Sequence, residues 1–254
     1  MNKPAVGKPD YGNWVSRKLI YVSGVLGLVF LGLSLVLPVL AIGAAFFLVS
    51  SAYFAYARYL FSARGGNIQA RIRDLVLEQL DWDGEGTVLD IGCGNALLTI
   101  QAAQKYPRAQ VIGIDYWGGK WEYSQSVCER NAALEGVAER VTFQKASASA
   151  LPFEEGIFDA AVSNLVFHEV SDTKDKRAII KEALRVVKKG GAFAFQDEFL
   201  FRAIYGEVDD LLETIQSWGI ERVAFVNTSD SEFIPKALKL PFMTGAIGIL
   251  HGKK

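Results

Sequence analysis

Val88-Leu89-Asp90-Ile91-Gly92-Cys93-Gly94-Asn95-Ala96 is the stretch that decides the fold of this chain. Its apolar start is typical of a buried strand, and the two glycines allow a sharp turn and a close approach of a ligand to the backbone. The segment Ala96–Lys105 that follows has the apolar periodicity of a helix. This order of elements predicts an open α/β sheet, in which ligands bind beyond the carboxyl ends of the strands.

The same alternation of short apolar runs and amphipathic segments continues along the chain. The strand-like runs are Thr87–Ile91, Val111–Asp115, Val141–Gln144, Phe158–Leu165, Ala192–Gln196, Ile220–Val226 and Ala246–His251. The helix-like segments are Asn67–Leu80, Ala96–Lys105, Lys120–Leu134, Lys174–Val187 and Val208–Trp218. Strands that alternate with helices predict parallel strands joined by right-handed crossovers. We expect Gly190-Gly191 to stop the helix that begins at Lys174.

An uncharged apolar stretch runs from Leu19 to Ala57. A membrane-spanning helix needs about 20 apolar residues. We therefore expect a transmembrane helical hairpin with helices at about 19–37 and 39–59, broken at Pro38 because proline disfavours helix continuation. The stretch is too long for the apolar core of a signal peptide, which spans about 7–15 residues. A shallow hairpin within one leaflet and a helical pair buried in a soluble core are the alternatives.

Basic residues flank this apolar stretch on both sides. They are Lys3, Lys8, Arg17 and Lys18 before it, and Arg58, Arg64, Arg71 and Arg73 after it. Positively charged flanks stay in the cytoplasm. We therefore expect residues 1–62 to form an anchor in the cell membrane and residues 67–254 to form a domain that faces the cytoplasm.

A nucleoside site is predicted where the second strand ends in Asp115, because a carboxylate there can accept hydrogen bonds from both ribose hydroxyls. A nicotinamide dinucleotide site expects a third glycine three residues after the second, but Leu97 stands at that position. Asp90 would also repel a pyrophosphate, whereas it suits the cationic methionine end of S-adenosylmethionine. The residues therefore favour S-adenosylmethionine over a dinucleotide.

In their order, these segments resemble the motifs of class I S-adenosylmethionine-dependent methyltransferases. Asp90–Gly94 resembles the first motif, Ile114-Asp115 the second, Leu151–Phe153 and Phe158–Asn164 the approach to the fourth strand, and Glu182–Gly191 the helix and turn before the fifth. The resemblance covers roughly Asn67 to the C-terminus. It implies an α/β, Rossmann-like, seven-stranded and mostly parallel sheet with an antiparallel last strand and helices on both faces, and it implies S-adenosylmethionine as the cofactor.

The resemblance also implies which residues bind the cofactor. Asp90, Gly92 and Gly94 would surround the methionine portion, Asp115 would hold the ribose, Tyr116 would pack against the adenine, and Asn164 would face the transferred methyl group. The family often has an acid near the adenine amino group, and Ser147 stands at that position here, where its hydroxyl can still form a hydrogen bond. Cys93, as a small packing residue of the turn, and Ala148, beside Ser147, complete the predicted set.

Methyl transfer from a sulfonium needs no nucleophile of the protein, because the cofactor supplies the electrophile and the protein aligns the acceptor. His168 follows the fourth strand and titrates near neutrality, so it is a candidate general base, with a structural or substrate-contacting role as the alternative. Asp197 and Glu198 are candidates to contact the acceptor, with a solvated acidic loop as the alternative. Two cysteines and two histidines show no metal-ligand spacing, so no metal is expected.

The net charge of −1 shows no bulk attraction to nucleic acid, and no nucleic-acid partner is expected. An anchor raises the local concentration of acceptors that are dissolved in the bilayer. We therefore expect transfer of a methyl group to a lipid or another hydrophobic small molecule. The alternatives are the same chemistry on a soluble or protein acceptor, and a non-catalytic nucleoside-binding module that kept the fold.

Overall fold

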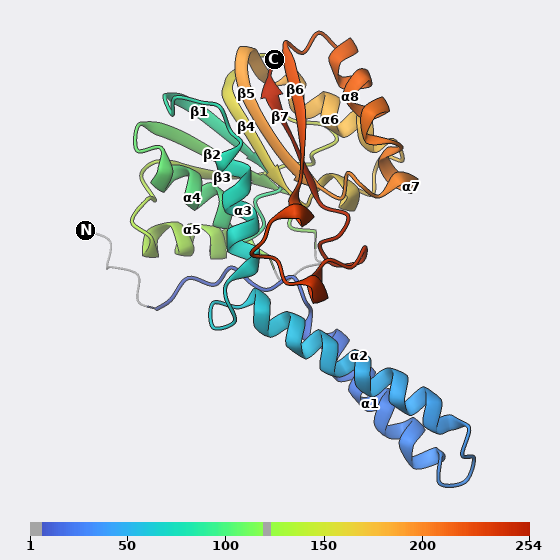
Figure 1. The fold of residues 1–254 in the computed structure, drawn as a ribbon. Coiled ribbons are helices and arrows are strands. Elements are labelled where there is room, and N and C mark those ends of the chain that lie inside the picture. Colours follow the sequence, from blue (N-terminus) through green and yellow to red (C-terminus); the bar gives the residue numbers. More distant parts are fainter. Residues whose placement is uncertain (1–6, 119–122) are drawn as a thin grey trace. The chain divides into compact units, whose positions relative to one another are not determined.

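The computed structural model describes residues 7–118 and 123–254, which form two compact units (Figure 1). Asn13–Arg71 make one unit, called here the hairpin unit. Ile72–Lys254, together with the described residues that precede Asn13, make the other, called here the sheet unit. The hairpin unit is therefore inserted into the chain of the sheet unit. The chain passes from the sheet unit to the hairpin unit after Gly12 and returns to the sheet unit at Ile72.

The hairpin unit consists of two antiparallel helices, α1 (Arg17–Leu33) and α2 (Leu40–Phe61), which pack along their length (Figure 1). Glycine allows the two backbones to approach closely. A Cβ atom added at Gly27 would lie 2.7 Å from the side chain of Leu48, and one added at Gly43 would lie 2.6 Å from Phe30. The Ser51 hydroxyl also donates a hydrogen bond to the Ile20 carbonyl oxygen at 2.9 Å. Small residues at a helix–helix interface are typical of helices that pack in a membrane.

α1 ends at Leu33, about one turn before the expected Leu37, because the chain needs the residues before Pro38 to reverse its direction. Within the described part of the chain, α2 is the one helix that is long and apolar enough to cross a membrane, with a mean hydropathy of 1.7. Large apolar side chains are exposed along both helices and at the turn, where Leu35 and Val36 are each 88% exposed. Insertion of the pair into a membrane stays a prediction.

The sheet unit contains a seven-stranded sheet. Its strands are β1 (Gly86–Ile91), β2 (Ala109–Asp115), β3 (Val141–Lys145), β4 (Phe158–Asn164), β5 (Val187–Asp197), β6 (Arg222–Asn227) and β7 (Gly248–Lys253). Their order in the sheet is β3-β2-β1-β4-β5-β7-β6, and β7 runs antiparallel to both of its neighbours while the other pairs are parallel. The predicted mostly parallel sheet with an antiparallel last strand is confirmed.

Helices cover both faces of this sheet. They are α3 (Ile68–Glu78), α4 (Leu97–Lys105), α5 (Gln125–Leu134), α6 (Lys176–Arg185), α7 (Arg202–Tyr205) and α8 (Val208–Ser217), with short 3₁₀ helices η1 (Phe167–Glu169), η2 (Thr228–Asp230) and η3 (Lys236–Leu238). One apolar core joins Val88 and Val111 of the strands to α3, α4 and α5, and the other joins Leu89 and Phe195 to α6 and α8. The alternation of side chains along each strand therefore supplies two cores. The helix predicted from Lys120 begins, within the described residues, at Gln125, and residues 119–122 lie outside them.

The expectation that Gly190-Gly191 stops a helix is wrong. α6 ends at Arg185 and β5 already begins at Val187, so both glycines lie within the strand. Gly190 has a φ of +75°, and a Cβ atom added at Gly191 would lie 2.9 Å from the Asp159 carbonyl oxygen. The pairing of β5 with β4 shifts register in this region. The glycines therefore serve a strand irregularity and a close backbone contact, which are the other common uses of glycine.

The segment before the hairpin unit binds to α5, which no sequence pattern indicated. The Asp10 backbone N–H donates to Asn131 Oδ1 at 3.0 Å, and Asn131 Nδ2 donates in return to the Asp10 carbonyl oxygen at 2.9 Å. The Tyr11 hydroxyl donates to Glu135 at 2.9 Å. Asn131 Nδ2 also donates to the Asn95 carbonyl oxygen at 3.0 Å, which connects this segment to the glycine turn after β1.

Candidate functional site

The predicted site residues gather at one edge of the sheet, called here the site edge, where the carboxyl ends of all strands except β7 meet (Figure 1). Parallel strands bring their carboxyl ends to the same edge. The glycine turn follows β1, Asp115 ends β2, Asn164 ends β4, and Asp197 ends β5.

The glycine turn uses its own backbone N–H groups. The N–H groups of Gly92 and Cys93 both donate to the Ile114 carbonyl oxygen, at 2.7 and 2.9 Å, and that of Ala96 donates to the Cys93 carbonyl oxygen at 2.7 Å. The Gly94 N–H donates to Asp115 Oδ2 at 2.9 Å. A pyrophosphate at a helix N-terminus needs such groups as donors. Because they are engaged within the protein, the turn offers no phosphate cradle at these positions, which agrees with the interpretation of Asp90 and Leu97.

Asp115 is held over the turn by two backbone donors. Its Oδ2 accepts from Gly94, and its Oδ1 accepts from the Trp117 N–H at 2.8 Å. Burial raises the pKa of this carboxyl group, and the hydrogen bonds from Trp117 and Gly94 oppose that shift. Each carboxylate oxygen can accept more than one hydrogen bond. Asp115 therefore keeps capacity for the two ribose hydroxyls of an adenosine.

Asp90 lies buried at the end of β1, on the face that α4 covers. Its Oδ2 accepts from the Thr99 hydroxyl at 2.6 Å. Burial raises its pKa to about 7, while the hydrogen bond from Thr99 and the guanidinium of Arg73 act in the opposite direction. A carboxyl group with this pKa is close to half ionised at neutral pH, and a nearby cation would complete its ionisation. Its chemistry therefore fits a ligand that carries a positive charge.

The predicted adenine-side residues lie at the same edge and range from exposed to buried. Tyr116 is 63% exposed, with Lys145 Nζ 5.1 Å from its ring centroid. Ala148 is buried. The hydroxyls of Ser147 and Ser149 both donate to Asp172 Oδ2, at 2.9 and 2.6 Å. These hydroxyls hold the pKa of Asp172 below its usual value. Asp172 therefore places a carboxylate next to Ser147. The two residues are 25 positions apart in the chain, so the sequence pattern around Ser147 did not indicate this carboxylate.

Asn164 offers a buried acceptor. Among the described residues, Asn164 Oδ1 has no hydrogen-bond partner, and the same is true of Oε1 of Gln196, its register partner on β5. The residue after Asn164, Leu165, has a φ of +56°, which turns the chain away from the strand. Buried amide oxygens are nearly always hydrogen-bonded, so orphaned ones indicate a place for a ligand or a water molecule. This pair supports a ligand site at the ends of β4 and β5.

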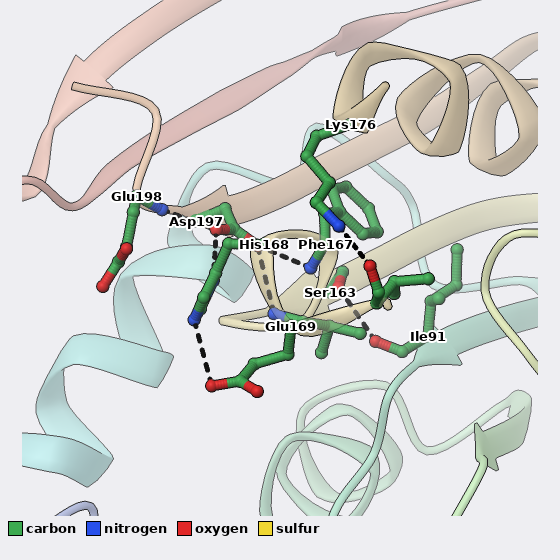
Figure 2. Close-up of polar contacts among 10 residues, drawn as sticks. Ile91, Ser163, Phe167, His168, Glu169, Lys176, Asp197 and Glu198 are labelled. Atoms are coloured by element: carbon green, nitrogen blue, oxygen red, sulfur yellow. Dashed lines mark hydrogen bonds and ion pairs between the residues drawn. The ribbon is translucent and has the colours of Figure 1, made fainter. Parts of the chain in front are cut away.

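His168 lies between two carboxylates (Figure 2). Its Nδ1 is 2.6 Å from Asp197 Oδ1, and its Nε2 is 3.6 Å from Glu169 Oε1. Burial alone would lower the pKa of His168, but the hydrogen bonds to Asp197 and Glu169 raise it to about 10. His168 is therefore protonated at neutral pH in this structure and would have to lose that proton before it could act as a general base. Its catalytic role stays a prediction.

Asp197 is fully buried, so the alternative of a solvated acidic loop does not hold for it. Its Oδ2 accepts from the N–H groups of Val166 and Phe167, at 3.1 and 2.7 Å, and its Oδ1 accepts from that of Glu198 at 2.7 Å. Together with the bond to His168, these contacts fix the segment after β4 to the end of β5. Glu198 is half-buried, and burial raises its pKa.

Comparisons with known proteins agree with this geometry. A family model described as a methyltransferase domain matches residues 89–195. An uncharacterized methyltransferase of Synechocystis sp. is 30% identical over 190 residues, which cover 73% of this chain and 84% of that protein. The demethylmenaquinone methyltransferase of Symbiobacterium thermophilum is 33% identical over 107 residues, which cover 42% of this chain and 40% of that protein. The matches to this and other similar curated relatives span between 27% and 45% of the relatives' lengths.

Among solved structures, the geranyl diphosphate C-methyltransferase of Streptomyces coelicolor in complex with S-adenosyl-L-homocysteine is similar, with a TM-score of 0.55 and 14% identity over 75% of this chain and 81% of that chain. At that identity the likeness concerns the fold alone. The likeness to the Synechocystis protein carries more, because 30% identity extends over 73% of this chain and 84% of that protein. This chain belongs to the family of S-adenosylmethionine-dependent methyltransferases.

Proposed function

We propose that this protein is anchored in the cell membrane by its hairpin unit and that it transfers a methyl group from S-adenosylmethionine to a lipid or another hydrophobic small molecule at the cytoplasmic face. The observation that carries the proposal is the exposed apolar surface of α1 and α2 in a chain whose other unit is a methyltransferase. Apolar surface of this extent indicates contact with a membrane or with another protein.

The dimensions and charges of the hairpin unit fit a bilayer. α2 has 22 residues and is about 33 Å long, close to the hydrocarbon thickness of about 30 Å. Arg17 and Lys18 lie at the start of α1, and Arg58 lies near the end of α2. Asn13 Nδ2 donates to the Arg58 carbonyl oxygen at 3.1 Å, so these basic ends lie together. Positively charged ends stay in the cytoplasm, which favours a cytoplasmic sheet unit.

One similar protein is named a ribosomal RNA large subunit methyltransferase, whereas several others are named for small acceptors. Two are named for demethylmenaquinone, one for ubiquinone and menaquinone biosynthesis, and one solved structure is of a geranyl diphosphate methyltransferase. Others are named malonyl-[acyl-carrier protein] O-methyltransferase. A protein-borne acceptor is therefore the alternative that the experiment has to distinguish.

The residues at the site edge have separable tasks in this proposal. The bound cofactor supplies an electrophilic methyl group. Asp115 would hold the ribose, Asp90 would face the positive charge, and Asn164 Oδ1 would accept a hydrogen bond from the ligand. His168, protonated and oriented by Asp197, would donate from Nε2 to the acceptor, and Glu198 is the nearby carboxylate that can take up a proton. This arrangement favours an acceptor that arrives as an anion or carries a lone pair at the reacting atom.

The experiment is incubation of the full-length protein with methyl-labelled S-adenosylmethionine and a membrane extract of the source cells. We expect label in the fraction that is soluble in organic solvent. Two variants are compared. The double substitution Val25→Arg, Val49→Arg places charges at the exposed centre of the hairpin unit, and the control Ile157→Arg places a charge on the exposed surface of the sheet unit. An arginine at a helix centre costs about 3 kcal/mol of insertion free energy.

The hairpin variant should lose transfer to the membrane fraction and keep cofactor binding by calorimetry, whereas Ile157→Arg should keep both. Label that accumulates on protein or in water-soluble products would overturn the acceptor class. Failure of the unmodified protein to bind the cofactor would overturn the enzymatic proposal.

A further inference from the structure

We propose that the site edge of the sheet unit is itself a lipid-contacting surface, in which Phe201, Leu240 and Phe242 enter the bilayer interface beside the place of methyl transfer. The inference rests on the proposed membrane attachment and goes beyond it, because it names the part of the sheet unit that meets lipid and the route by which an acceptor arrives.

The exposed apolar side chains of the sheet unit are concentrated at this edge. Among its described residues, the large exposed hydrophobic side chains are Tyr116, Ile157, Phe201, Leu240 and Phe242. Tyr116 follows β2, Phe201 follows β5, and the other two at this edge follow β6. Ile157 alone precedes a strand, β4, and lies at the opposite edge. A random scatter of apolar residues would not favour one edge, and a concentrated patch indicates an interaction surface.

The residues after β5 and those after β6 are joined. The Leu200 N–H donates to the Ala246 carbonyl oxygen at 3.0 Å, and the Gly245 N–H donates to the Leu240 carbonyl oxygen at 2.9 Å. β7 then begins at Gly248, which pairs with Asp197 of β5 and Asn227 of β6. The segment 228–247 therefore starts and ends at the site edge, and in Figure 1 it lies at the end of the sheet remote from the C-terminus.

The chain connects the sheet unit to the hairpin unit at this same edge. A Cβ atom added at Gly12, the last residue before the hairpin unit, would lie 3.3 Å from the Tyr123 ring and 4.0 Å from Asn95 of the glycine turn. Arg73, next to the first residue after the hairpin unit, acts electrostatically on Asp90 and Tyr123. The chain therefore leaves the sheet unit and re-enters it near the site edge, whereas Ile157 lies at the opposite edge.

The charges of residues 236–243 fit an anionic membrane surface, whereas Asp230 and Glu232 lie earlier in segment 228–247. Lys236-Ala-Leu-Lys239-Leu-Pro-Phe-Met243 contains two lysines and no acidic residue. Cations beside an apolar tip are attracted to the anionic lipids of the cytoplasmic leaflet. Phe242, at 65% exposed, is the most exposed of the four apolar side chains at the edge. With this edge against lipid, an acceptor dissolved in the bilayer reaches Asn164 and His168 without crossing bulk water.

The test uses the full-length protein in vesicles that contain anionic lipid, with an environment-sensitive fluorophore on a single introduced cysteine. Phe242→Cys reports the proposed surface, Ile157→Cys is the matched control at the opposite edge, and Val36→Cys reports hairpin insertion. Cys93 and Cys128 are buried, and the labelled unmodified protein gives their background. We expect quenchers carried by lipid to remove most of the emission at 242 and at 36 but not at 157.

The outcomes separate this inference from the proposed function. Quenching at 36 with none at 242 overturns the lipid-contacting edge and leaves the membrane anchor intact. No quenching at 36 overturns the anchor. If lipid-borne quenchers do not reduce the emission at 242, but a water-soluble quencher becomes less effective there as the protein concentration rises, the surface is an interface between copies of the chain. The inference is then wrong.

A second measurement uses the variant Phe201→Ser, Leu240→Ser, Phe242→Ser in the labelled-extract assay. We expect transfer to membrane-borne acceptors to fall by roughly tenfold or more, with cofactor affinity unchanged. Unchanged transfer overturns the proposed route.

Discussion

His168 Nδ1 and Asp197 Oδ1 are 2.6 Å apart, and the two residues join the 3₁₀ helix after β4 to the last residue of β5. Asp197 also accepts hydrogen bonds from three backbone N–H groups, so its position is fixed independently of His168. The orientation of the imidazole ring therefore depends mainly on this buried carboxylate, and its charge depends on Asp197 together with the more exposed Glu169.

The pH dependence of His168 follows from this contact. With a pKa of about 10 in the folded state against 6.5 in the unfolded state, protonation of His168 stabilises the fold. This contribution is fully present below pH 6.5, declines above it, and is lost as the pH rises through about 10. We expect one histidine in an NMR titration to keep its proton until about pH 10. His251, whose pKa is lowered by burial, is the internal reference. A titration of His168 near 6.5 would contradict the prediction.

Asp197→Asn removes the charge that holds His168. The substitution leaves the positive charge of the half-buried His168 imidazolium without its main partner. We therefore expect the free energy of unfolding at pH 7 to fall by about 3 kcal/mol. The pKa of His168 should fall toward 6.5 in the same variant. Glu169→Gln is the matched control, because its contact with Nε2 is longer, at 3.6 Å, and more exposed. Urea unfolding of both variants checks the difference, and equal losses would argue against the dominant role of Asp197.

Gly92→Ala should destabilise the protein for two reasons. Gly92 has a φ of +74°, and an added Cβ atom would lie 2.2 Å from the side chain of Val166. Gly136→Ala is the control, since Gly136 has a φ of +72° with nothing within 4 Å of the added atom. We expect a loss of about 1–2 kcal/mol for Gly136→Ala and a further 1–3 kcal/mol for Gly92→Ala. Thermal unfolding measures both, and Val166→Ala should recover part of the excess if the clash is its cause.

Asp115→Asn should weaken cofactor binding. The substitution removes the negative charge and one of the acceptors that hold the Gly94 and Trp117 N–H groups. Loss of a charge-assisted hydrogen bond corresponds to a dissociation constant that is raised by about tenfold to a hundredfold. Asp83→Asn is the control, because Asp83 also accepts a backbone N–H, that of Glu85, before β1. Calorimetry with the cofactor should find the control unchanged, and an unchanged Asp115→Asn would remove the basis for the ribose assignment.

Gly27→Val should separate the two helices of the hairpin unit. A Cβ atom at Gly27 meets Leu48 at 2.7 Å, whereas one at Gly32 meets nothing within 4 Å. We expect Gly27→Val to cost about 1–3 kcal/mol of helix–helix association and Gly32→Val to cost little. Resistance to a protease in detergent distinguishes the two variants, and equal resistance would mean that α1 and α2 do not pack through Gly27.

The strands, the helices and the parallel pairing could be predicted from periodicity and element order, whereas the antiparallel last strand was implied by the resemblance to the methyltransferase family. Asp115 ends a predicted strand, and Asn164, which the resemblance nominated, is the last but one residue of another. The register irregularity at Gly190 was not predictable, because a glycine pair that ends a helix and one that serves a strand have the same composition. The turn of the hairpin contains Pro38 as predicted, but α1 ends at Leu33 and not at about 37, because apolarity alone does not mark where a helix stops.

Contacts between distant segments were also beyond the sequence. Asp172 meets Ser147, and Asp10 meets Asn131, through hydrogen bonds that local patterns do not contain. The protonation of His168 depends on Asp197, which lies 29 residues away in the chain. A sequence can nominate a histidine as a base, but only its neighbours in space decide whether it carries a proton.

The attachment of Asp10 to Asn131 has a consequence for biosynthesis. The partners are 121 residues apart, and at about 5–20 residues per second the ribosome needs roughly 6–24 s to make the intervening chain. The apolar hairpin emerges within that interval, well before α5 exists. In the membrane-anchored protein that we propose, the hairpin is therefore available for insertion before the sheet unit is complete, and Asp10 finds its partner on α5 only afterwards.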